Sequence, residues 1–347
     1  MGQDNTQMLV EQIAQAHSEA RPLAIHGGGS KGFLGHELTG EAVDITGHQG
    51  IVNYQPVELV MTVRAGTPLA EVESALAEKG QCLAFEPPAF GDSATIGGTI
   101  ATGLSGPARP YTGSARDFML GVRVINGQGQ ALRFGGEVMK NVAGYDVSRL
   151  MTASHGSLGL ITEVSLKVLP VPKAVRTLAI PASANEAIAL FNRLAGQPLP
   201  ISATAWTDNQ AYIRLSGAAS AVEAAAQQMG GEATDNAIWT SFKELTHHSV
   251  AAQSTLWRLS VPQTASLDLD CPLVEWGGGQ RWYAGDVPEQ ELRAKVEAIG
   301  GHATLYRGQA ERVFHPLKPA MSALHSRIKH SFDPKALFNV GRFHPEF

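Results

Sequence analysis

The sequence has few cysteines, no long apolar run and no excess of positive charge. Cys82 and Cys271 are its only cysteines and form no CxxC pair, which excludes a disulfide framework, a zinc ribbon and a resident iron–sulfur cluster. The formal net charge of −5 argues against nucleic acid as the main partner. No run approaches the roughly 18 apolar residues that span a bilayer, and no basic start precedes an apolar block at the N-terminus. These absences predict a cytoplasmic protein.

The bulk composition is that of an ordinary soluble globular chain with room for two or three domains. Its 347 residues are 44% apolar and 17% charged. Pro170 and Pro172 break the chain after a series of β-like runs, so we expect a first domain at 1–172, a second at 173–315 and a C-terminal segment at 316–347. In the second domain, the order of strand and helix patterns predicts an α+β layer with an antiparallel sheet and helices on one face.

Local signals place several elements. A helical pattern covers 6–20, and Thr67-Pro68 opens a second helix. Asn126-Gly127 is a hairpin signal. Capping boxes at Ser183 with Glu186 and at Ser220 with Glu223 predict two helix starts. By contrast, residues 86–113 show no obvious element, and a loop of that length is typical of a functional segment.

Three glycine-rich segments lie beside β-like runs in the first half of the chain. They are 26–31 (HGGGSK), 95–99 (TIGGT) and 140–159. Because glycine lacks Cβ, backbone N–H groups in such loops can crowd onto phosphate oxygens. Taken alone, the first loop is equally well read as a flexible turn or as an anion-binding nest. Three such loops together indicate one extended ligand with a charged middle, such as FAD.

Two better-known nucleotide folds do not fit the first loop. Residues 27–32 formally satisfy GxGxxG after a strand, but that fingerprint needs a following helix. Residues 33–41 contain two glycines and no helical period, and Phe33 stands where a Walker A loop has its lysine. A dinucleotide site of the Rossmann type and a P-loop are therefore both excluded.

The third segment carries a specific resemblance. Lys140–Asp146 reads KNVAGYD and Ser154–Thr162 reads SHGSLGLIT, and Gly113–Asp117 supplies a G-x-x-R-D element. With the GGG and TIGG loops, these elements resemble, in order, the flavoproteins with a PCMH-type FAD-binding domain, the vanillyl-alcohol-oxidase group. The closing segment Asp333–Phe343 resembles that family's D-P-x-x-x-x-N-P-G segment, which returns to the flavin domain, although Val340 replaces the proline.

The resemblance implies a two-subdomain PCMH-type FAD-binding domain, a smaller α+β cap with a ferredoxin-like antiparallel sheet, and a set of FAD contacts. The implied contacts are His26, Gly27, Gly28, Gly29, Ser30, Lys31, Pro87, Thr95, Ile96, Gly97, Gly98, Thr99, Gly103, Arg116, Gly144, Asp146, Ile161 and Asn339. Members with covalent flavin place a histidine directly after the glycines. Ser30 and Lys31 stand there instead, so non-covalent FAD is expected. His155 replaces an acidic residue or glutamine and is read as a packing or capping residue.

The chain also departs from relatives that oxidise small 2-hydroxy acids. Those relatives carry an H-x-H…G-D-G-x-x-H metal and base cluster, and none of the 12 histidines here forms H-x-H. His247-His248 falls on a predicted helix, where neighbours point to different faces, so no metal is expected. Residues 274–283 (VEWGGGQRWY) instead resemble the family of FAD-binding E subunits of bacterial glycolate oxidases. In that family the subunit works with a larger flavin subunit and an iron–sulfur subunit.

The resemblance implies a function in glycolate catabolism. The chain would carry FAD for electron transfer from glycolate, oxidised to glyoxylate, toward the iron–sulfur partner, and would reach the inner membrane only through the complex. Two alternatives stay open: an autonomous FAD-dependent 2-hydroxy acid oxidase, and a non-redox assembly subunit. The catalytic residues are unassigned. Arg258, Arg281 and Arg307 are candidate carboxylate clamps and Glu275 a candidate base, against a simpler reading as salt bridges on a sheet edge.

Overall fold

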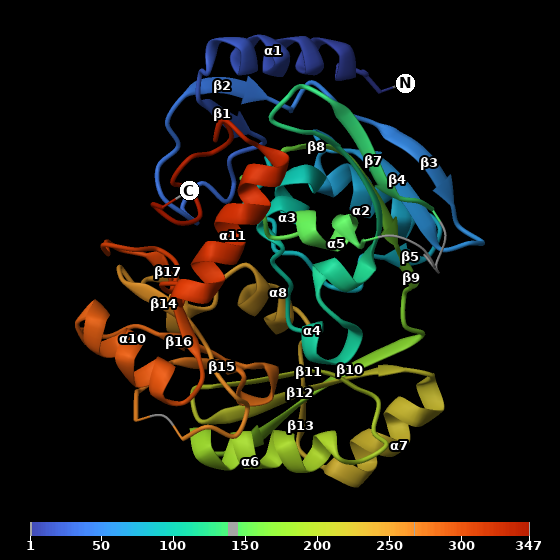
Figure 1. Cartoon of the computed structure of the whole chain (residues 1–347). Coiled ribbons are helices and arrows are strands. Elements are labelled where there is room, and N and C mark those ends of the chain that lie inside the picture. The colour runs from blue at the N-terminus through green and yellow to red at the C-terminus, as the bar shows by residue number, and fades with distance from the viewer. Residues whose placement is uncertain (1, 138–144, 267, 347) are drawn as a thin grey trace. The chain divides into compact units, whose positions relative to one another are not determined.

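The computed structural model describes residues 2–137, 145–266 and 268–346, and the chain divides into two compact units (Figure 1). Unit 1 comprises Met1–Leu104, Ser114–Val171 and Pro316–Phe347, and unit 2 comprises Ser105–Gly113 and Pro172–His315. Residues 105–113, which the sequence analysis placed in the first domain, therefore cluster with the second unit. Their short helix α4 (Arg109–Thr112) packs on Trp276, whose ring lies 4.6 Å from the Arg109 guanidinium.

A five-stranded antiparallel sheet forms the centre of unit 1, in the order β3-β4-β8-β6-β7. Its strands are β3 (Ile51–Gln55), β4 (Val60–Arg64), β6 (Met119–Ile125), β7 (Ala131–Gly135) and β8 (Leu160–Lys167). The central strand β8 is buried along nearly its whole length, as a strand covered on both faces should be. The hairpin predicted at Asn126-Gly127 is confirmed, because β6 and β7 pair there and Asn126 Oδ1 accepts the N–H groups of Gln128 and Gln130.

Two smaller pairings complete the strands of unit 1. β1 (Leu23–His26) runs parallel to β2 (Glu41–Asp44), and β5 (Gln81–Cys82) pairs with β9 (Leu169–Pro170). On its other side β1 is bridged by Phe338, so the red C-terminal segment in Figure 1 lies directly beside the blue strand. The C-terminal segment therefore pairs with β1 on the side opposite to β2.

The helices of unit 1 are α1 (Thr6–Glu19), α2 (Leu69–Ala77), α3 (Ile96–Thr102), the 3₁₀ turn η1 (Ala115–Phe118), α5 (Val147–Met151) and α11 (Pro319–Phe332). The helices expected at 6–20 and after Thr67-Pro68 are confirmed as α1 and α2. The expectation that 86–113 has no element is wrong, since α3 and α4 lie inside it. Two of the seven residues of α3 are glycine, a poor helix former, and that composition concealed the helix.

Unit 2 is built on one eight-stranded antiparallel sheet in the order β13-β10-β12-β11-β15-β16-β14-β17. The strands are β10 (Ala174–Pro181), β11 (Ile201–Thr207), β12 (Gln210–Gly217), β13 (Glu232–Thr234), β14 (Leu256–Ser260), β15 (Leu273–Glu275), β16 (Gln280–Tyr283) and β17 (His302–Arg307). The first four strands, with α6 and α7 between them, follow the βαββαβ order of a ferredoxin-like unit. The last four repeat the arrangement with one intervening helix, and β11 pairs with β15 to join the halves.

The helices of unit 2, besides α4, are α6 (Ala184–Ala195), α7 (Ala219–Met229), α8 (Ile238–Lys243), α9 (His248–Ala251), α10 (Glu289–Ala298) and the 3₁₀ turn η2 (Trp276–Gly278). The capping box of Ser183 and Glu186 at α6 is confirmed. The one predicted at Ser220 is wrong, because α7 already begins at Ala219 and Glu223 pairs with Arg176 instead. With its mixture of helices and antiparallel sheets, the chain has the predicted α+β class.

Candidate functional site

A cavity of about 610 Å³ lies in unit 1, where the first glycine loop, α3, the 155–161 turn and the C-terminal segment meet. It is lined by Ile25, His26, Gly27, Gly28, Gly29, Ser30, Lys31, Gly32, Phe33, Gly35, Glu37, Leu38, Ile45, Ala65, Thr95, Gly97, Gly98, Ala101, Thr102, His155, Gly156, Gly159, Leu160, Ile161, Asn339 and Arg342. Segments more than 300 residues apart in the sequence thus line the same cavity.

The first loop presents unused backbone donors. The N–H groups of Gly28, Gly29 and Ser30 donate to no group in the described part of the chain. Gly28 lies so close to Ser93 that a Cβ would fall 1.4 Å from the Ser93 carbonyl oxygen, and Gly29 has a φ of +75°. Both positions therefore require glycine. Successive N–H groups of this kind form a concavity suited to an anion.

Lys31 brings a positive charge to the same loop. The residue is 7% exposed, and its Nζ lies 3.2 Å from the Ala89 carbonyl oxygen and 3.4 Å from Ser30 Oγ. The Phe90 ring lies 5.9 Å from the ammonium. The Lys31 ammonium therefore lies at the cavity, where its positive charge attracts an anionic ligand.

The second wall comes from α3. Thr95 caps this helix by accepting the Gly98 N–H at its Oγ1, and a Cβ on Gly97 would lie 2.6 Å from the Ala65 Cβ. The glycines therefore let α3 lie directly against the strand end at Ala65 while keeping the cavity open. Ile96 and Thr99, on the same helix, are fully buried and do not line the cavity.

The C-terminal segment fixes the remaining wall through Asn339 and Arg342. The Asn339 amide accepts the Ile25 N–H and donates to the His155 carbonyl oxygen, each at 2.8 Å. Arg342 donates to the carbonyl oxygens of His36, Gly32 and Lys31 and so holds the first loop in place. Both side chains hold the segments that line the cavity in place. For Asn339, a contact with the flavin edge was expected from the sequence.

The structure places the expected contact residues in three groups. Those that line the cavity are His26, Gly27, Gly28, Gly29, Ser30, Lys31, Thr95, Gly97, Gly98, Ile161 and Asn339. Pro87, Ile96 and Thr99 are buried away from it, and Gly103 ends α3 against Ala153. Arg116 is exposed, and Asp146 caps α5. Gly144, with the rest of 138–144, lies outside the described residues.

Several residues that line the cavity were not predicted from the sequence. Phe33, Gly35, Glu37 and Leu38 continue the first loop beyond its glycines, and Arg342 comes from the tail motif, where only Asn339 was selected. His155 lines the cavity with a φ of +52°, and its ring stacks on Phe343 at 5.2 Å. Its reading as a packing residue agrees with this contact.

The donor set and the shape of the cavity fit FAD. The unused N–H groups and Lys31 are suited to a pyrophosphate, while Ile25, Ile45, Leu160 and Ile161 supply an apolar surface for a planar ring. A few polar groups within a mostly apolar lining are typical of cofactor sites.

The residues considered for substrate chemistry in unit 2 are held by structural contacts. Glu275 is 2% exposed, and its Oε2 accepts from Gln280 Nε2 at 2.8 Å and from Trp282 Nε1 at 2.7 Å. Arg281 and Arg307 donate to backbone carbonyl oxygens, and Arg258 donates to the Tyr306 hydroxyl. Within the part of the chain that the structure describes, these arginines therefore hold the sheet and its loops together and do not form the salt bridges considered from the sequence.

His248 lies on a helix as expected, but the expectation that His247 lies on it too, with the two rings on different faces, is wrong. His247 is the N-cap of α9 and His248 its first residue, and their ring centroids are 4.2 Å apart. Asp208 lies beside them.

Comparison with known proteins identifies the class. The profile of the FAD binding domain family matches residues 3–135. The solved structure of alkyldihydroxyacetonephosphate synthase has a TM-score of 0.66 at 15% identity, covering 96% of this chain and 75% of that one, which supports the fold. D-2-hydroxyglutarate dehydrogenase of Xanthomonas citri pv. viticola is 36% identical, over 38% of this chain and 28% of its own. The chain is thus a flavoprotein with an FAD binding domain.

A full-length relative narrows this assignment. Glycolate oxidase subunit GlcE of Escherichia coli K12 is 45% identical over 346 residues, which cover 99% of this chain and 98% of that protein. The chain belongs to the family of this subunit. Glycolate oxidase subunit GlcD of Bacillus subtilis is 35% identical over 37% of this chain and 27% of its own. Within the described residues, no helix is both long enough and apolar enough to cross a bilayer.

Proposed function

We propose that the chain binds FAD non-covalently in the unit 1 cavity. The unused N–H groups of the first loop carry the proposal, because a pyrophosphate accepts hydrogen bonds from such donors and is attracted by the positive charge of Lys31 beside them. Ser30 and Lys31 follow the glycines where covalently flavinylated relatives have histidine. The remaining expected contacts, including Pro87, Gly103, Arg116, Gly144 and Asp146, belong to this proposal as residues to be tested.

The function supported best is that of an FAD subunit in a glycolate oxidase complex. When bound, FAD supplies the two-electron chemistry that turns glycolate into glyoxylate and passes electrons onward. The residues of this chain hold the pyrophosphate, shape the cavity and exclude water from its apolar part. The proposed partners are a larger flavin subunit and an iron–sulfur subunit, with the chain at the cytoplasmic face of the inner membrane through them.

An autonomous 2-hydroxy acid oxidase is the second candidate, favoured by relatives such as D-2-hydroxyglutarate dehydrogenase. The contacts of Glu275 and the three arginines weigh against it, because these groups already have protein partners. A non-redox assembly subunit is the third candidate, and the donor-rich loop weighs against it.

Two measurements on the purified full-length chain separate these candidates. A two-band flavin absorption spectrum, with flavin released by denaturation, supports non-covalent FAD, and a colourless protein that also fails to take up added FAD supports the assembly role. Anaerobic glycolate is then added. Bleaching of the flavin band by the isolated chain identifies an autonomous oxidase. Bleaching that requires co-purified flavin and iron–sulfur subunits identifies the complex subunit.

A further inference from the structure

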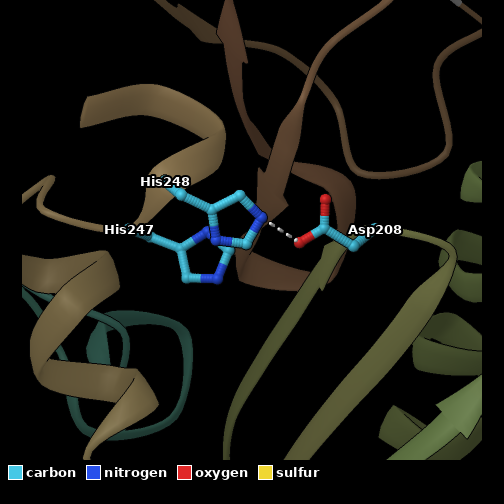
Figure 2. Close-up of side chains that lie close together, drawn as sticks. All are labelled: Asp208, His247 and His248. Carbon is cyan, nitrogen blue, oxygen red and sulfur yellow. Dashed lines mark ion pairs between the residues drawn. The ribbon is translucent and has the colours of Figure 1, made fainter. Parts of the chain in front are cut away.

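Asp208, His247 and His248 form a cluster in unit 2 that the proposed flavin chemistry does not use (Figure 2). His248 Nε2 lies 2.9 Å from Asp208 Oδ2, and the potential ligand atoms of all three residues lie within 4.8 Å of one another. The side chains of His248 and Asp208 are 74% and 46% exposed. An ion can therefore reach the cluster from solvent.

The turn of a tight hairpin positions Asp208. Thr207 pairs with Gln210 across β11 and β12, so Asp208 and Asn209 form a two-residue loop with φ values of +51° and +57°. Two positive φ values are typical of a type I′ turn, whose geometry matches the twist of the strands. The Asn209 carbonyl oxygen also accepts the Ala182 N–H at 3.0 Å. The carboxylate is thus presented from a fixed backbone.

The start of α9 positions the two histidines. The His247 carbonyl oxygen accepts the N–H groups of Val250 and Ala251, and Arg307 donates to the carbonyl oxygens of Leu245, Val250 and Ala251. These bonds tie the turn to β17. Because His247 is the N-cap and not a mid-helix residue, its ring can lie beside that of His248.

Neighbouring side chains hold the His247 ring. It packs against Phe242 at 5.0 Å, and its Nδ1 lies 2.9 Å from Ser249 Oγ and 3.4 Å from the Ser249 backbone nitrogen. In the tautomer in which Nδ1 donates to Ser249 Oγ, this bond fixes the ring and Nε2 presents its lone pair to a metal.

We propose that Asp208, His247 and His248 bind one Zn²⁺ ion. With bonds of 2.0–2.1 Å, two ligands of a tetrahedral zinc ion lie about 3.3 Å apart. The 2.9 Å separation of His248 Nε2 and Asp208 Oδ2 needs to open slightly, which rotation of these two exposed side chains allows. Two imidazoles and one carboxylate favour zinc over magnesium or calcium, which prefer oxygen ligands. Three protein ligands leave the fourth position to water or to a ligand from solvent.

The test is calorimetric titration of Zn²⁺ into the chelator-treated full-length flavoprotein. The wild-type chain should bind one ion per chain. Losing a hydrogen-bond partner of a ligand typically weakens metal binding roughly 10- to 100-fold, so we expect that range for Ser249→Ala. His247→Gln, His248→Gln and Asp208→Asn, which remove a ligand, should lose at least as much. His330→Gln is the matched control, because His330 is exposed on α11, and it should bind like wild type.

Circular dichroism and flavin content establish that each variant is folded, and neither should change. The site is independent of the flavin cavity, so failure of flavin binding leaves this prediction standing and testable. Absence of saturable Zn²⁺ binding would overturn the site, leaving Asp208 and His248 as an ion pair. Equal affinity in wild type and the ligand variants would also overturn it, as would an equal loss in His330→Gln.

Discussion

The side-chain amide of Asn339 donates to the carbonyl oxygen of His155 at 2.8 Å, and both residues line the cavity. The same amide accepts the Ile25 N–H, so one residue near the C-terminus joins β1 to the turn before β8. Asn339 is 4% exposed and has a φ of +44°, a conformation that asparagine tolerates better than most residues. The last segment of the chain therefore determines how the first glycine loop and the 155–161 turn face each other.

Replacing Asn339 with alanine should destabilise the chain and weaken FAD binding together. The substitution removes the acceptor of the Ile25 N–H and a donor to the His155 carbonyl oxygen, and each buried hydrogen bond lost in this way costs about 1–3 kcal/mol. Thermal unfolding and the flavin-to-protein absorbance ratio are the measurements. Asn185→Ala, on the exposed side of α6, is the control. A variant that keeps wild-type stability while losing flavin would instead assign Asn339 a direct cofactor contact.

Lys329 should contribute more to stability than any exposed lysine. The residue is 5% exposed, and its ammonium donates to Asp333 Oδ2 and to the carbonyl oxygens of Ser157 and Phe338, at 2.7–2.8 Å. Burial lowers its pKa, and the Asp333 carboxylate opposes that shift. Lys329→Met strands a buried carboxylate, which typically costs about 3–5 kcal/mol.

Denaturant unfolding measures the effect of Lys329→Met. Adding Asp333→Asn should recover part of the loss, since the stranded charge is removed. Lys79→Met, at an exposed position, should change the free energy of unfolding by no more than about 0.5 kcal/mol. Equal effects of the two lysine substitutions would contradict the structural role of Lys329.

Sequence patterns predicted the elements whose signals are local. The apolar spacing of α1 and α2, the Asn126-Gly127 turn and the glycine loops needed only neighbouring residues. Contacts between distant segments were beyond such patterns. The pairing of Asn339 with His155 depends on where the tail returns, and Asp208 meets His247 only because a hairpin and the start of α9 meet in space. The glycines of α3 were read as loop residues because helix propensity ignores tertiary packing.

Gly28→Ala should abolish or strongly reduce FAD binding. The new Cβ would fall 1.4 Å from the Ser93 carbonyl oxygen, so the loop has to move and its N–H groups lose their alignment. Flavin content after purification measures this effect. Gly136→Ala is the matched control, because a Cβ there meets nothing within 4 Å, and it should retain wild-type flavin content. Full flavin occupancy in Gly28→Ala would show that this loop does not hold the cofactor.

Lys31→Met should weaken FAD binding without unfolding the chain. A hydrogen bond to a charged group is worth about 1.5–3 kcal/mol, which corresponds to roughly 10- to 100-fold in the dissociation constant. Titration of apoprotein with FAD, followed by flavin fluorescence, measures the change. Lys31→Arg should retain more affinity than Lys31→Met, since it keeps the charge. Equal affinity of Lys31→Met and wild type would remove Lys31 from the site.

His48 should make the chain less stable in mild acid. Its side chain is fully buried, and its Nδ1 accepts the Asn5 N–H at 3.0 Å, with Asp4 and Arg64 nearby. Desolvation is the largest influence and lowers the pKa of His48; Asp4 raises it and Arg64 lowers it further. The unfolded chain therefore takes up a proton near pH 6.5 that the folded chain does not. The stability that His48 contributes is complete above that pH and is lost as pH falls toward the folded-state pKa.

His48→Gln removes this proton uptake while keeping an oxygen that can accept the Asn5 N–H. The variant should be less stable than wild type at pH 7.5 because its packing is altered, and the difference should narrow as the pH falls to 5.5. Unfolding temperatures measured across this range check the trend. His330→Gln, at an exposed position, is the control and shows how a histidine substitution without burial changes the unfolding temperature with pH. A stability difference that stays constant with pH would mean that His48 takes up its proton equally in the folded and unfolded chains.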